Sequence, residues 1–108
     1  MLKETWRKFS LLEQMANIGS EVSRFVYWKE RGEEKEAENS FYRALELIDL
    51  TLSDKRWRRN IALREVGLLR EILADYFLGL SSFNLSSESL KNYFLPFALA
   101  ISNDQQQE

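Results

Sequence analysis

The 108-residue chain contains no cysteine and no histidine. Without cysteine, disulfides, thiolate metal sites and cysteine nucleophiles are excluded, and the composition fits a reducing cytoplasm. Without histidine, the chain lacks the commonest general base near neutral pH and the commonest transition-metal ligand. A Ser-His-Asp arrangement is therefore impossible within these residues. We predict no metal site and no cofactor, and any catalysis would rest on carboxylates, lysine, arginine, tyrosine or serine.

The sequence is also poor in turn-forming residues and in long apolar runs. Four glycines and one proline are too few for an all-β sandwich, which needs a turn every ~8–12 residues. The opening "MLKETWRKFS" carries charges of both signs and lacks the apolar core of a signal peptide. The run "YFLPFALAI" is far shorter than the ~20 residues that span a bilayer. We therefore expect a soluble, cytoplasmic helical protein that makes no contact with membranes.

What the chain does contain is sufficient for one hydrophobic core. Hydrophobic residues make up 44% of it and aromatic residues 13%, so it is not a disordered tail. With 108 residues there is room for one domain, which we place at residues 1–102. The polar end "NDQQQE", residues 103–108, is expected to be disordered.

Apolar residues recur at helical spacing in four segments, which predicts an all-α protein. Leu11, Met15, Ile18, Val22 and Phe25 follow a 4-3-4-3 spacing and share one face. The helices are predicted over residues 5–30, 33–52, 53 or 54 to 78, and 86 or 87 to 102. Short connections between amphipathic segments indicate an antiparallel four-helix bundle with up-down topology.

The ends of these helices carry the expected signals. Gly32 and Gly79 stand where the first and third helices should stop, and Ser53 or Asp54 is a suitable N-cap for the third. Pro96 lies inside the fourth helix and should kink it.

Several stretches, "ANIGSEVSRFVYWKERG", "RALELIDLTLSD", "REILADYFLG" and "SLKNYFLPFALA", resemble a family of small, uncharacterised all-helical bacterial proteins. The resemblance covers most of residues 11–101. It implies a helical fold and a prokaryotic origin, and it implies no activity.

The four-helix layout is more distantly similar to the HEPN-type bundles. That group includes toxin ribonucleases and the helical partners of small nucleotidyltransferases. Its ribonuclease members use an Arg followed four to six residues later by His, and this chain has no His. The resemblance therefore implies a bundle that works beside another chain, without the ribonuclease activity.

The stretch "SDKRWRRN" is strongly basic in a chain of net charge −2. Residues 55–70 hold six basic and one acidic side chain, whereas residues 33–54 hold two basic and seven acidic. Cations beside the free N–H groups of a helix start can bind an anion or nucleic acid, which makes Lys55, Arg56 and Arg59 candidates. The alternatives are a solvated charged surface and a contact with a protein partner. The pI of 5.3 disfavours nucleic acid.

A second group of charges lies close to the apolar faces of the predicted helices. A buried carboxylate needs a partner, so we expect an internal ion-pair network. Its candidate members are Glu21, Arg24, Arg58, Arg64 and Glu65.

The alternative for such charges is a carboxylate-lined site like that of the MazG-type nucleotide pyrophosphohydrolases. Those enzymes bind Mg²⁺ through Glu-x-x-Glu and Glu-x-x-Asp pairs. Glu33 and Glu36 have the first spacing, but Glu71 and Asp75 are four apart rather than three. The match is poor.

Most aromatic residues stand at core spacing, but a few apolar residues fall outside the inner stripes. Trp6, Trp28, Tyr42 and Leu50 could form an exposed patch that a second copy or a partner covers. We therefore predict a non-enzymatic bundle that acts by self-association, as a homo-oligomer such as a dimer, or by binding a partner macromolecule. A carboxylate-dependent hydrolase and weak RNA or anion binding at residues 55–59 are the alternatives.

Overall fold

The computed structural model describes residues 3–57, 62–79 and 92. All regular structure in this part of the chain is helical, and it contains no strand. The helices are α1 (Lys3–Trp6), α2 (Leu11–Glu30), α3 (Glu34–Leu52), the 3₁₀ helix η1 (Lys55–Trp57) and α4 (Ala62–Leu78). The all-α prediction is confirmed for these residues. The predicted fourth helix, with Pro96, and the tail at 103–108 lie outside them.

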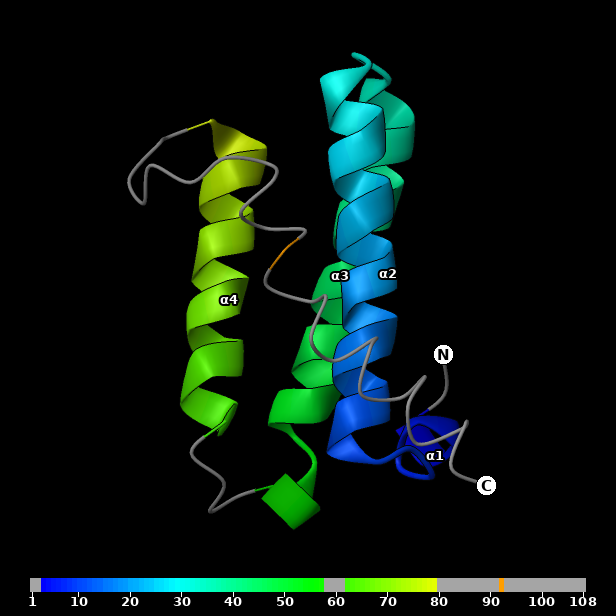
Figure 1. The fold of residues 1–108 in the computed structure, drawn as a ribbon, viewed down its shortest axis with the longest axis vertical. Helices are drawn as coiled ribbons and strands as arrows, with labels where there is room; N and C mark the ends of the chain where they lie inside the picture. Colours follow the sequence, from blue (N-terminus) through cyan, green and yellow to red (C-terminus); the bar gives the residue numbers. More distant parts are fainter. Residues whose placement is uncertain (1–2, 58–61, 80–91, 93–108) are drawn as a thin grey trace.

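The predicted first helix is in fact two helices, because a capping box interrupts it. The backbone N–H of Glu13 donates to the Ser10 hydroxyl at 3.1 Å, and the N–H of Ser10 donates to the Glu13 carboxylate at 3.0 Å. These bonds satisfy free N–H groups at the start of α2. The chain before Ser10 therefore leaves the α2 axis and forms α1 beside it (Figure 1).

Helices α2 and α3 form an antiparallel hairpin, as the short connection predicts (Figure 1). Gly32 makes the turn with φ +73°, a conformation that favours glycine. The predicted bounds of α3 are confirmed within one residue. Met15, Ile18, Val22 and Phe25 of the predicted stripe are buried in the hairpin, and Ala44 and Ile48 are buried on α3.

Helix α4 runs back along the hairpin on the side opposite α1 (Figure 1). The rings of Phe41 and Phe77 stack at 4.2 Å with an interplanar angle of 4°, and Phe25 packs against both. Seven residues before Phe77 in α4, Arg70 Nε donates to Asp49 Oδ1 at 2.8 Å. These contacts fasten α4 to the hairpin at two levels.

The start of the predicted third helix is wrong. Ser53 is the C-cap of α3, and the carboxylate of Asp54 accepts the backbone N–H of Arg56, which opens η1 instead. The predicted end is confirmed, since α4 stops at Leu78 and Gly79 has φ +71°. On α4, Val66, Leu69 and Leu73 are buried, whereas Leu68 is 48% exposed.

Candidate functional site

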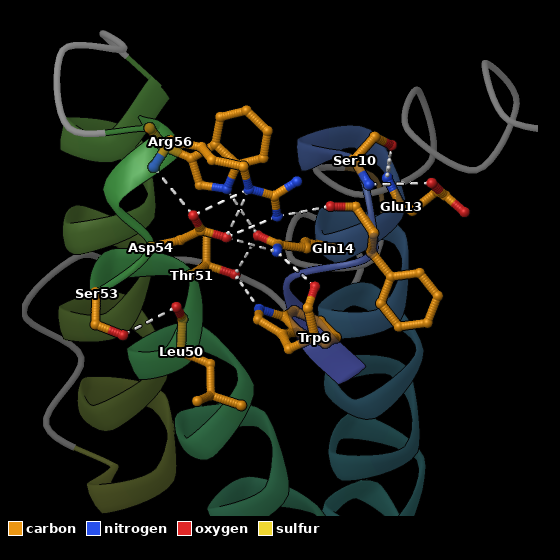
Figure 2. A network of polar contacts seen from close by, with 11 residues as sticks. Trp6, Ser10, Glu13, Gln14, Leu50, Thr51, Ser53, Asp54 and Arg56 are labelled. Atoms are coloured by element: carbon orange, nitrogen blue, oxygen red, sulfur yellow. Dashed lines mark hydrogen bonds and ion pairs between the residues drawn. The ribbon is translucent and has the colours of Figure 1, made fainter. Parts of the chain in front are cut away.

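The amide of Gln14 is the centre of a buried polar cluster at one end of the hairpin (Figure 2). Gln14 Oε1 accepts from the Thr51 hydroxyl at 3.1 Å and from the indole nitrogen of Trp57 at 3.0 Å. Gln14 Nε2 donates to the backbone oxygen of Trp6 at 3.0 Å and to Asp54 Oδ2 at 3.2 Å. All four hydrogen-bonding positions of the amide are therefore used.

The cluster joins segments that lie far apart in the sequence. Trp6 adds a second contact, because its indole nitrogen donates to the Thr51 hydroxyl at 3.0 Å. Trp6 belongs to α1, Gln14 to α2, Thr51 to α3 and Trp57 to η1. Within the described part of the chain, no buried side-chain nitrogen or oxygen lacks a partner. The cluster thus fixes the position of α1 and η1 against the hairpin.

Asp54 and Arg56 form an ion pair beside this cluster. Arg56 Nη2 lies 2.7 Å from Asp54 Oδ2, and it also donates to the backbone oxygen of Phe9 at 2.8 Å. The hydrogen bonds from the Arg56 side chain lower the pKa of the Asp54 carboxyl from 3.8 to about 2, against the opposing effect of burial. The guanidinium also lies 4.4 Å from the centre of the Trp57 ring.

The sequence predicted Lys55, Arg56 and Arg59 as anion contacts. The guanidinium of Arg56 instead binds Asp54 and the backbone oxygen of Phe9, so it stabilises the corner. Lys55 is exposed. Arg59 lies outside the described residues.

The structure brings together part of the predicted ion-pair network and adds a member. Glu21, whose side chain is 13% exposed, binds Arg24 Nη1 at 2.7 Å and Arg43 Nε at 3.0 Å. Arg43 also donates to the buried Ser40 hydroxyl at 3.1 Å. The sequence missed Arg43, although it follows Glu36 at the seven-residue spacing that places both on one face of α3.

The structure does not place the other three predicted members, Arg58, Arg64 and Glu65, in this network. Arg64 is exposed. Arg58 and the side chain of Glu65 lie outside the described part of the structure.

Of the predicted interface residues, Trp6 cannot contribute to an exposed patch. It is 1% exposed, because its ring fills the corner and its indole nitrogen bonds Thr51. Trp28 and Leu50 are half-buried, and Tyr42 is 55% exposed. Tyr27, at 44%, and Leu78, at 64%, are further exposed apolar side chains that the sequence did not single out.

The two ends of the hairpin carry opposite charge. We call Lys3, Arg7, Lys8 and Lys55 the basic end: all four are exposed, and α1 and η1, which carry or adjoin them, lie at the same end of the hairpin (Figure 1). We call Glu33, Glu34, Glu36 and Glu38 the acidic end, and all four are exposed at the start of α3. The sequence missed Lys3, Arg7 and Lys8, because a continuous first helix would have carried them away from Lys55.

A cavity of about 280 Å³ lies at the acidic end, lined by Lys29, Gly32, Glu34, Ala37, Glu38 and Phe77. The ammonium of Lys29 already donates to the backbone oxygen of Phe77 at 3.2 Å. Of the residues that suggested a magnesium site, Glu33, Glu36 and Glu71 are exposed and Asp75 is buried. Among the residues described, no three acidic side chains are grouped so that they could hold a metal ion.

None of the helices described here is long and apolar enough to cross a membrane. The chain matches no protein-family model, and no curated protein or solved structure matches it. The resemblances to small bacterial helical proteins and to HEPN-type bundles therefore remain predictions, and the function must be argued from the geometry.

Proposed function

We propose that this protein is a non-enzymatic association module, which acts by binding a second copy of itself or a partner macromolecule. The scaffold we propose is an antiparallel four-helix bundle, completed by the helix predicted at residues 86–102. The observation that carries the proposal is the pair of oppositely charged ends, whose side chains form no ion pair within the described part of the chain.

The difference between the charged ends and the buried polar groups of the interior supports the proposal of an association module. In the part of the chain that the structure describes, every buried polar side chain has a hydrogen-bond partner within the fold. The charges at the two ends are instead exposed to solvent, and so are the rings of Tyr27 and Tyr42, each of which also packs against one neighbouring ring. Complementary charges across an interface favour specific encounter and correct register.

Light scattering coupled to gel filtration tests the proposal on the full chain, loaded at concentrations from ~10 to ~500 µM. We expect the mass to rise above that of a monomer in this micromolar range, which is typical of small interfaces. If the chain stays monomeric, a pull-down followed by reconstitution with the purified partner decides the second form of the proposal. A monomer for which no purified macromolecule reconstitutes a complex would contradict both forms.

A further inference from the structure

We propose that two copies of the chain pair antiparallel about a two-fold axis, so that the basic end of each contacts the acidic end of the other. This inference rests on the proposed function and names the partner as a second copy. It also names the side of the molecule that the partner covers.

The first support is the balance of charge between the two ends. Residues 3–8 hold three basic and one acidic side chain, for a net charge of +2, and residues 53–57 add +1. Residues 33–38 hold four acidic and one basic side chain, for a net charge of −3. The two groups are thus opposite in sign. Within the acidic group, Glu33 and Glu36 lie on one face of α3, and Glu34 and Glu38 lie on the opposite face. They lie at opposite ends of a 20-residue helix, a separation of ~30 Å at 1.5 Å per residue.

The second support is that both ends lie along one side of the hairpin. Helix α1 docks on Gln14, which lies seven residues before Glu21 and hence on the same face of α2. Glu21 binds Arg43, which shares a face of α3 with Glu36, again seven residues away. One side of the hairpin therefore carries α1, then the Glu21–Arg43 pair, then the acidic start of α3.

Among the described residues, helix α4 does not cover this side. It contacts α3 through Asp49, and a separation of six residues places Asp49 about 120° around α3 from Arg43. In Figure 1, α1 and α4 lie on opposite sides of the hairpin. In the middle of this side, the side chains of Arg24 and Arg43 are 58% and 51% exposed.

An antiparallel two-fold pairing is the arrangement that uses both ends at once. Each copy offers its basic end to the partner's acidic end and receives the reverse contact, so the assembly closes as a dimer. A head-to-tail arrangement would leave one basic and one acidic end unpaired at every stage. Nucleic acid fits less well, because the acidic end on the same side would repel phosphate and the net charge of the chain is −2.

The affinity should be modest and sensitive to salt. Exposed ion pairs contribute ~0–1 kcal/mol each, and salt screens them over distances of about 8–10 Å at physiological strength. We therefore expect dissociation in the micromolar range at low salt.

Charge reversal at each end tests the pairing by sedimentation. The first variant, Lys3→Glu with Arg7→Glu, makes the basic end acidic, and the second, Glu33→Lys with Glu36→Lys, makes the acidic end basic. The control, Glu34→Lys with Glu38→Lys, makes the same charge change on the opposite face of α3, which lines the cavity. Circular dichroism establishes that each variant is folded.

We expect each reversed variant to dimerise at least ~10-fold more weakly than the wild type, whereas the control dimerises as the wild type does. A 1:1 mixture of the two reversed variants should recover a heterodimer, because each reversed end then meets its opposite. A misfolded variant could not produce this recovery.

The proposal is overturned if the mixture stays monomeric, if the control loses the dimer as fully as the reversed variants do, or if the mass grows with concentration beyond a dimer. A wild type that is monomeric at low salt also overturns it, as does binding of single-stranded RNA in place of dimer formation. A purified protein or RNA that the monomer binds would leave the proposed function intact while this inference fails.

Discussion

The indole nitrogen of Trp6 donates a hydrogen bond to the hydroxyl of Thr51, 45 residues further along the chain, at 3.0 Å. Both side chains are buried, and the same hydroxyl donates to Gln14. This relationship ties the first helix to the end of α3. It therefore places the basic residues of segment 3–8 at the same end of the hairpin as Lys55.

Substitution of Gln14 should destabilise the protein strongly. Gln14→Leu keeps the volume but leaves the Trp57 indole, the Trp6 backbone oxygen and Asp54 each short of one partner. Buried polar groups without partners cost ~1–3 kcal/mol each, so we expect a loss of about 3 kcal/mol in the free energy of unfolding. Urea denaturation measures this loss of stability.

The control is Asn17→Ala in the same helix. It should change stability by less than about 0.5 kcal/mol, since the exposed amide of Asn17 bonds only the Glu13 backbone oxygen. Equal losses would contradict the central role of Gln14.

The bond between Trp6 and Thr51 should appear as a coupling energy. Trp6→Phe removes the indole N–H and keeps a ring in the corner, and Thr51→Val removes the hydroxyl with little change in shape. Denaturation of both single variants and the double variant gives a cycle with an expected coupling of about 1 kcal/mol. Additive losses, with no coupling, would mean that the two side chains do not hold α1 in place through this bond.

The ion pair of Asp54 with Arg56 predicts a loss of stability in acid. The folded-state pKa of Asp54, about 2, lies below its unfolded value of 3.8. Its contribution is therefore complete above pH 4 and is lost as the pH falls toward 2. We expect about 1–2 kcal/mol from this carboxyl group.

The measurement compares the wild type with Asp54→Asn, which cannot titrate at this position. The stability difference between them should shrink between pH 6 and pH 2.5. A difference that stays constant across this range would show that the pair does not depress the pKa of Asp54.

Phe77 should be the residue through which α4 is held on the hairpin. Its ring stacks on Phe41 and packs against Phe25, so Phe77→Ala should cost about 3–4 kcal/mol. The neighbouring Leu78 is 64% exposed, and Leu78→Ala should cost less than about 0.5 kcal/mol. Thermal unfolding of both variants, followed by circular dichroism, checks the contrast. Similar losses for the two would contradict the packing described here.

The regular helices could be predicted from the sequence because each depends on local signals. The apolar spacing of Met15 to Phe25 and the glycines at 32 and 79 define faces and ends without reference to distant residues. The same kind of signal was available at Ser10, where Ser-x-x-Glu before an apolar run is typical of a helix start. The helix start at Ser10 was not recognised because Trp6, Phe9 and Leu12 continue the apolar helical spacing across it.

The corner could not be predicted, because its hydrogen bonds depend on the tertiary fold. The sequence pattern places Gln14 at the polar edge of α2. Its side chain is buried because α1 and η1 pack against it. Asp54 was predicted to cap an α-helix, but Arg56, two residues later, binds its carboxylate, and the 3₁₀ helix η1 forms there instead. Pairings such as Glu21 with Arg43 likewise depend on the register of the hairpin, which the helical pattern leaves open.

The most direct test of the account is the salt dependence of the wild-type dimer, followed by sedimentation at one protein concentration in the micromolar range. Raising the salt from ~50 to ~500 mM should weaken the dimer about tenfold or more, because its contacts are exposed charges at the two ends. A protein that is monomeric at the lowest salt, or a dimer that strengthens as salt rises, would contradict the claim that the charged ends drive association.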